Sequence, residues 1–197
     1  MSALRLGILG STRGTNMQAI IEAIRANHLA ASIQVVISNK EKSGILDKAR
    51  AYHLPAIFLD PATLTRDAYD TAVSTVLLSH SVELILLMGY MRILSSAFVQ
   101  TWQHNILNVH PSLLPAFAGG MDQDVHQAVI DSGATQSGCT IHYVTEEIDA
   151  GPILWQKQCV VLPHDTPMTL KARVQMLEAQ AWIATLQHLV RMKHEST

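Results

Sequence analysis

The chain is poor in charged residues and in cysteine, and each shortage argues against a class of function. Asp, Glu, Lys and Arg make up 15% of the 197 residues, and the formal net charge is −2. This balance gives no indication of the basic surface by which proteins bind nucleic acids. The two cysteines, Cys139 and Cys159, lack the spacing of metal ligands. We therefore expect buried free thiols and no bound metal.

Long apolar runs are also missing. The longest continuous run, Leu84 to Met88, is far shorter than the roughly 20 residues that a membrane helix needs. The first residues enter a strand-like pattern directly, without a charged leader and a cleavage site. With 48% hydrophobic residues, the chain can still build a sizeable core. We expect a cytoplasmic protein that acts on small molecules, as a monomer or a homodimer, with neither nucleic acid nor membrane as a partner.

Short apolar runs alternate with amphipathic helical patterns through the first half of the chain. Strands are expected at Leu4–Leu9, Ser32–Ser38, Ala56–Leu59 and Glu83–Met88. Helices are expected around Met17–Ile24, at Gly44–His53, after Thr65 as N-cap, and at Ser95–Trp102. This alternation indicates repeated strand–helix–strand units and a parallel sheet.

The order of predicted elements is different in the second half of the chain. A strand ending at His110 is followed by a loop over 111–124, a helix at 124–132, strands at 140–144 and 153–162, and a final helix from Pro167. No helix separates the last two strands, so they can pair antiparallel. The sequence thus predicts an α/β fold: an open twisted sheet with a parallel, Rossmann-like N-terminal half, an antiparallel C-terminal part, and helices on both faces. We treat 1–197 as one domain, with a phosphate-binding half (1–105) and a catalytic half (106–197).

The segment Asn105–Pro115 carries the strongest functional signal. Strand side chains alternate between faces, so Asn108 and His110 point to the same side, roughly 6–7 Å apart. Pro111 cannot donate to a ladder, so His110 lies at the end of the strand. Each polar residue alone is explained as a core residue that satisfies nearby backbone. The pair, on one face at the carboxyl end of a strand, favours a site.

Two loops at other strand ends are candidate binding elements. Gly7–Asn16 joins the first strand to the first helix, where Thr15 and Gln18 are expected to form a capping box. Backbone N–H groups at a helix N-terminus favour a phosphate, although an ordinary capped turn explains this loop equally well. Met88–Leu94 follows the central strand, and its Met, Arg and aliphatic side chains either grip a flat heteroaromatic ring or fill the core.

The roles of three further polar residues depend on where the fold places them. Asp149 lies on a turn, where an aspartate usually caps backbone. If it faces His110, it would keep that imidazole charged near neutral pH. His142 either supports the site or fills space, and Glu178, at the edge of the last helix's apolar stripe, suits an ion pair or a ligand contact.

Taken together, these segments resemble the folate-dependent phosphoribosylglycinamide formyltransferases over nearly the whole chain. The matching motifs are Gly14–Ile20, Gly89–Leu94, Asn108–Pro115, Ile148–Pro152 and Ala172–Gln175. The resemblance implies the formyltransferase fold and the transfer of a formyl group from 10-formyltetrahydrofolate to 5-phosphoribosylglycinamide in purine biosynthesis. The co-substrate is then a formylfolate, and no metal takes part.

The resemblance also implies roles for individual residues. Asn108 and protonated His110 would stabilise a negatively charged tetrahedral intermediate, and Asp149 would orient His110 and help remove the amine proton. The remaining residues fall into two groups. Gly14, Thr15 and Asn16 would hold the acceptor's phosphate, Met91 and Pro111 its glycinamide end, and Glu178 its sugar or amine. Arg92, Ile93, Leu94 and Val144 would hold the pterin ring, and Arg66 lies near the folate tail.

The chain departs from many relatives at Ser11–Arg13 and in the flap over 116–122 that follows Pro115. Four alternatives stay open from the sequence. Two are other formylfolate enzymes, a methionyl-tRNA formyltransferase or a formyltetrahydrofolate deformylase. The third is a flavin reductase, because Gly10–Arg13 resembles a flavin-phosphate loop. The fourth is a phosphosugar-binding protein without catalytic activity.

Overall fold

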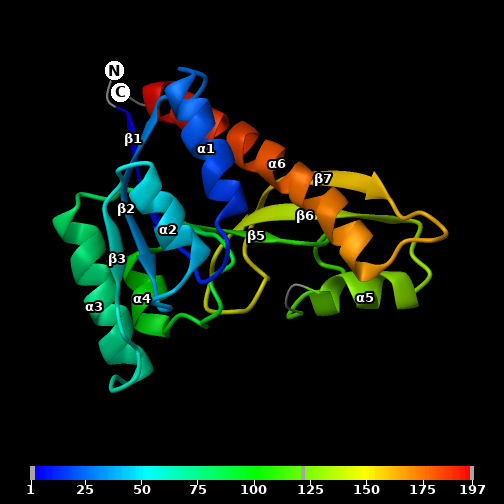
Figure 1. Cartoon of the computed structure of the whole chain (residues 1–197), viewed down its shortest axis with the longest axis horizontal. Coiled ribbons are helices and arrows are strands. Elements are labelled where there is room, and N and C mark those ends of the chain that lie inside the picture. The colour runs from blue at the N-terminus through cyan, green and yellow to red at the C-terminus, as the bar shows by residue number, and fades with distance from the viewer. Residues whose placement is uncertain (1–2, 121–122, 196–197) are drawn as a thin grey trace.

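The computed structural model describes residues 3–120 and 123–195, and its centre is one mixed sheet (Figure 1). The strand order is β3-β2-β1-β4-β5-β6-β7. The parallel strands are β1 (Leu4–Leu9), β2 (Ala31–Ser38), β3 (Ala56–Phe58), β4 (Leu84–Leu87) and β5 (Ile106–His110). β6 (Gln136–Tyr143) and β7 (Ile153–Val160) continue the sheet antiparallel. The predicted fold class is therefore confirmed.

Helices cover both faces of this sheet. They are α1 (Thr15–Arg25), α2 (Gly44–Ala51), α3 (Arg66–Ser79), α4 (Ser96–Thr101), α5 (Gln123–Asp131) and α6 (Pro167–Glu195). One apolar core lies between the sheet and α1, α2, α5 and α6, and a second lies on the other face beneath α3 and α4. α6 runs along the sheet from beside α5 to beside α1 (Figure 1). Within the described residues, no helix combines the length and the hydropathy that a membrane span requires.

Several element boundaries differ from those expected. β6 begins at Gln136 rather than at residue 140, and at Gly138 a Cβ would overlap the Lys157 carbonyl oxygen of β7. The polar and glycine residues at this end do not form the alternating pattern that predicts a strand. Pairing with β7 defines the strand there instead. α2 ends before His53, which adopts a left-handed conformation with φ 58°. β7 ends at Val160 rather than at residue 162.

The strand order explains where a site can form. From β1 the chain moves outward through β2 to β3, and it then returns to place β4 on the other side of β1. This reversal is a topological switch point, and in open α/β sheets ligands bind at the carboxyl ends of the strands there. The loops after β1, β4 and β5 therefore share one edge of the sheet. They contain the three segments that the sequence marks as functional.

Candidate active site

Four polar side chains lie on one face where β5 pairs with β6. In the antiparallel register Asn108 is opposite His142, and His110 is opposite Thr140. His110, Thr140 and His142 are all buried. A buried polar group needs a partner, so the contacts of these residues define what the site can do.

Asp149 reaches this group from the turn between β6 and β7. Its carboxylate Oδ2 lies 3.2 Å from Nδ1 of His110, and the two side chains are 10% and 3% exposed. Asp149 has φ 54°, a left-handed conformation that aspartate tolerates better than most residues. The same carboxylate oxygen accepts a hydrogen bond of 2.9 Å from the backbone N–H of Gly119. The structure thus brings together the aspartate and the histidine that lie 39 positions apart (149 − 110).

The second ring nitrogen of His110 is also occupied. Nε2 lies 2.9 Å from the backbone carbonyl oxygen of Phe117. Both neighbours of the ring, the Asp149 carboxylate and the Phe117 carbonyl, are acceptors. Both contacts are therefore hydrogen bonds only when each ring nitrogen carries a proton. Only that form of the ring presents a donor to each of the two acceptors.

His142 has the opposite character. Burial lowers its pKa, and this effect exceeds the opposing effects of the Tyr143 carbonyl and the Asp149 carboxylate. The neutral ring donates from Nδ1 to the Tyr143 carbonyl at 2.9 Å and accepts at Nε2 from the Asn108 amide nitrogen at 3.3 Å. Asp149 Oδ1 is 3.6 Å from the same Nε2, and this contact is an ion pair only if the ring is charged. The neutral ring instead fixes which end of the Asn108 amide faces it.

Thr140 holds the segment that follows His110. Its hydroxyl donates to the Ser112 carbonyl at 2.7 Å and accepts from the Leu114 N–H at 3.0 Å. The side-chain amide of Gln156, from β7, donates to the Thr140 hydroxyl and to the Leu114 carbonyl, both at 2.9 Å. Nothing in the sequence indicates a role for Thr140. The signal that could have found it is the β5–β6 register, which places it opposite His110.

The phosphate-loop candidate begins α1, but not by the expected cap. Gly14 is the N-cap, with φ 67°, and a Cβ there would approach Cγ1 of Ile45 to 2.6 Å. The helix therefore starts at Thr15, and the expected capping box between Thr15 and Gln18 is wrong. A glycine is needed where the backbone is both left-handed and tightly packed. Gln18 instead bonds Glu22 on the helix surface.

Asn16 and Glu178, two predicted substrate-binding residues, are in direct contact. The amide Nδ2 of Asn16 donates to Glu178 Oε2 at 2.8 Å, across 162 positions of sequence. Glu178 lies on α6 and is 8% exposed. A side-chain hydrogen bond therefore joins the start of α1 to the middle of α6.

In the loop after β4, some side chains pack against the core and others are exposed. Arg92 places its guanidinium carbon 4.4 Å from the ring centroid of buried Tyr69, and Leu94 packs against the second core. Cation–π packing therefore holds the Arg92 side chain against Tyr69. Met91 and Ile93 are 40% and 51% exposed.

Of the other predicted site residues, Pro111 and Val144 lie beside β5, whereas Arg66 does not. Pro111 directly follows His110 and is half-buried, and Val144 donates its N–H to the Ile106 carbonyl of β5 at 2.9 Å. Arg66 is exposed at the first position of α3, which follows β3 at the outer edge of the sheet. β2, β1 and β4 lie between β3 and β5, so Arg66 is not brought to the His110 group.

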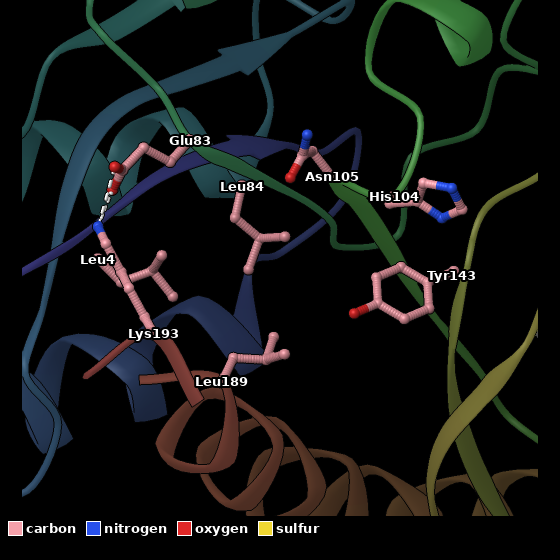
Figure 2. A pocket seen from close by; sticks show the side chains of 8 residues that line it. All are labelled: Leu4, Glu83, Leu84, His104, Asn105, Tyr143, Leu189 and Lys193. Carbon is pink, nitrogen blue, oxygen red and sulfur yellow. Dashed lines mark hydrogen bonds and ion pairs between the residues drawn. The ribbon is translucent and has the colours of Figure 1, made fainter. Parts of the chain in front are cut away.

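A cavity of about 260 Å³ lies elsewhere, at the opposite edge of the sheet (Figure 2). Leu4 and Leu84, the first residues of β1 and β4, line it. One side is closed by the ion pair between Lys193 and Glu83 at 2.9 Å. This cavity is thus separate from the His110 group. Over residues 3–120 and 123–195, no cluster of three or more His, Cys, Asp or Glu side chains is arranged to hold a metal ion.

The fold and the site define an α/β protein with a buried histidine–aspartate pair at the carboxyl edge of a mixed sheet, an arrangement suited to general acid–base chemistry. The chain belongs to the formyl transferase family, whose sequence model matches residues 4–186. It is 31% identical over 191 residues to the phosphoribosylglycinamide formyltransferase of Bacillus subtilis, and the match covers 96% of each chain.

Two further relatives extend this comparison. The human trifunctional purine biosynthetic protein adenosine-3 is 40% identical over 184 residues, which are 93% of this chain but only 18% of the human protein. The crystal structure of glycinamide ribonucleotide transformylase 1 from Symbiobacterium toebii superposes with a TM-score of 0.90 at 35% identity. That match covers 94% of this chain and 87% of the other.

Proposed function

We propose that this protein transfers the formyl group of 10-formyltetrahydrofolate to the amine of 5-phosphoribosylglycinamide, a step of de novo purine biosynthesis. Membership of the formyl transferase family and the names of the relatives with similar length support this activity. The observation that carries the proposal is the position of His110, held between the Asp149 carboxylate and the flap and next to Asn108. A formyl transfer needs such donors where the carbonyl oxygen becomes negative.

The reaction begins when the acceptor's amine attacks the formyl carbon. A C–N bond forms, and the formyl C=O becomes an alkoxide in a tetrahedral intermediate. The Asn108 amide and the Nε2–H of His110 donate hydrogen bonds to this oxygen. Asp149 keeps His110 protonated and oriented, and accepts the proton of the attacking amine directly or through water. Collapse of the intermediate breaks the bond to N10 of the folate, which leaves with a proton.

The flap, residues 116–120, has to move during this cycle. The Phe117 carbonyl occupies the ring nitrogen that would donate to the formyl oxygen. The substrate's oxygen therefore takes the place of a backbone oxygen, so His110 keeps a hydrogen bond in both states. The flap expected from the sequence continues through Met121 and Asp122, which lie outside the described residues.

The two substrates approach from different loops in this proposal. The phosphate of the acceptor binds Gly14, Thr15 and Asn16 at the N-terminus of α1, where backbone N–H groups and the helix dipole favour an anion. Glu178 contacts the acceptor's sugar or amine, and Met91 and Pro111 line its glycinamide end. The pterin ring lies on the loop of Ile93 and Leu94, beside Val144 and against the backbone of Arg92. A folate tail that crosses the ends of β1 and β2 would extend toward Arg66.

A single assay tests this function against its rivals. The purified protein is incubated with 10-formyltetrahydrofolate, with or without 5-phosphoribosylglycinamide, and tetrahydrofolate is measured. We expect product only when the acceptor is present. Product with water alone would identify a deformylase, and formylation of methionyl-tRNA instead would identify that transferase. Ligand binding without turnover would indicate a phosphosugar-binding protein. A bound yellow chromophore would indicate a flavin reductase.

A further inference from the structure

Ser11 joins three loops at the carboxyl edge of the sheet. It belongs to the loop after β1, and it is 4% exposed. Its backbone N–H donates to the Gly89 carbonyl at 3.1 Å, and its hydroxyl accepts from the Met91 N–H at 3.0 Å. The hydroxyl also donates to the Asn39 side-chain oxygen, in the loop after β2, at 2.5 Å. One side chain therefore connects the loop that leads to α1 with the loop that follows β4.

The bond to Asn39 orients the serine hydroxyl. A hydroxyl has one hydrogen, and in Ser11 this hydrogen points to the Asn39 oxygen. A lone pair is then left for the Met91 N–H, so the two bonds support each other. Asn39 is half-buried, and Ser11 connects its side chain to the β4 loop.

The two loops are also in tight steric contact. At Gly10, a Cβ would lie 2.9 Å from the Met88 carbonyl oxygen. At Gly89, which has φ 62°, a Cβ would overlap the Thr12 side chain. Close-packed groups without free space between them shift together rather than separately. A displacement of the loop after β1 therefore reaches Met91, whose exposed side chain faces solvent beside Ile93.

We propose that the Ser11 hydroxyl couples the two substrate sites, so that the phosphorylated acceptor and the folate bind with positive cooperativity. The inference rests on the proposed function, in which the acceptor's phosphate binds at the start of α1 and the pterin binds the loop of Met91 to Leu94. A ligand that orders one loop also fixes the other through Ser11, and the second ligand then binds an ordered loop at a smaller entropic cost. The coupling is reciprocal by thermodynamic linkage.

Equilibrium binding measures this coupling directly. Tetrahydrofolate carries no formyl group, so it and 5-phosphoribosylglycinamide form a complex that does not react. The dissociation constant of tetrahydrofolate is determined by calorimetry with and without saturating acceptor, and the experiment is repeated in the other order. We expect tetrahydrofolate to bind the wild-type protein at least about fivefold more tightly when the acceptor is bound.

Two substitutions test the role of the hydroxyl. Ser11→Ala should reduce the affinity ratio to less than about twofold, because the bond to Met91 is lost. Asn39→Ala, at a half-buried position, should also reduce the ratio, since the Ser11 hydroxyl is no longer oriented. A purely structural defect would weaken both ligands and leave the ratio unchanged. Should Ser11→Ala not fold, Asn39→Ala provides the test.

Ser38→Ala is the matched control. Ser38 is fully buried at the end of β2, and its hydroxyl accepts from the Lys40 N–H at 3.1 Å within its own loop. This variant should keep the wild-type ratio. A wild-type ratio near one, or an unchanged ratio in both Ser11→Ala and Asn39→Ala, overturns the proposal. Failure of the wild-type protein to bind either ligand would instead refute the proposed function.

Discussion

The Phe117 carbonyl oxygen and the Asp149 carboxylate lie on opposite nitrogens of the His110 ring, at 2.9 Å and 3.2 Å. The flap and Asp149 are themselves connected, because Gly119 donates its N–H to the same Asp149 oxygen that faces His110. The structure therefore has the flap closed onto the histidine–aspartate pair. In the proposed mechanism, a substrate oxygen reaches Nε2 only after the Phe117 carbonyl has moved away.

Replacement of Asn108 by alanine should remove one of the two donors to the alkoxide. We expect kcat to fall at least about a hundredfold, the usual effect of deleting one oxyanion donor. Steady-state turnover with both substrates measures this change. Asn105→Ala is the control, because Asn105 is exposed just before the same strand and its side-chain amide donates to the nearby Gln103 carbonyl. Turnover of the Asn108 variant within threefold of the control would exclude a donor role.

Asp149→Asn should separate the charge of this residue from its size. The amide keeps the shape of the carboxylate but no longer stabilises a protonated His110, so we expect turnover to fall at least about a hundredfold. The thermal unfolding midpoint of the variant shows whether the fold is kept. Glu147→Gln, at an exposed acid two positions earlier on the same turn, should retain full turnover. Equal activity of the two variants would remove Asp149 from the mechanism.

The sequence was sufficient for the parts of the fold that depend on local patterning. Alternating apolar runs predicted the parallel strands and their helices, since each run reflects burial on one or both faces. Asn108 and His110 could be paired because the strand period of two places them on one face. Met91 and Ile93 are exposed on the predicted loop, but nothing in the sequence indicated that Arg92 packs against Tyr69.

The remainder of the site depends on pairing between distant segments. His142 faces Asn108 through the β5–β6 register, and Thr140 meets Gln156 through the β6–β7 register. A single sequence does not specify either register. The contact of Phe117 with His110 uses a backbone carbonyl, so the identity of residue 117 gives no signal. The sequence predicts Thr15 as a cap residue because its side chain suits that position. The decisive fact was instead the backbone conformation of Gly14.

The buried His142 makes stability depend on pH. Burial lowers its folded-state pKa from the ordinary value of 6.5. Below pH 6.5 the unfolded chain therefore binds a proton that the folded chain does not, and the free energy of unfolding falls as the pH decreases. The slope approaches about 1.4 kcal/mol per pH unit for one proton until the pH reaches the folded-state pKa. Well above pH 6.5, where the ring is neutral in the unfolded chain as well, this residue contributes no slope.

Urea unfolding at pH 5, 6, 7 and 8 tests this effect. His142→Gln removes the titrating ring, so the variant should lose less stability than the wild type between pH 6.5 and 5. His164→Gln, at an exposed position before α6, is the control and should follow the wild-type curve. Parallel curves for the wild type and the His142 variant would show that His142 does not contribute to this slope.

Gly151→Ala should disturb both stability and catalysis. A Cβ at position 151 would overlap the Tyr143 carbonyl oxygen, which belongs to the backbone and cannot rotate away. The turn must then shift, at a cost of about 1–3 kcal/mol typical of overpacking. Asp149 lies two residues earlier, so its contact with His110 should lengthen and turnover should fall at least about tenfold.

Gly133→Ala distinguishes this steric effect from simple loss of a glycine. Gly133 has φ 70°, and a Cβ there would meet no atom within 4 Å. Alanine should cost about 1 kcal/mol through its left-handed conformation and leave turnover unchanged. Chemical denaturation and steady-state kinetics of the two variants measure both quantities. Equal turnover of Gly151→Ala and Gly133→Ala would mean that the displaced turn supports catalysis as well as the native turn. The distance between Asp149 and His110 would then not limit the reaction.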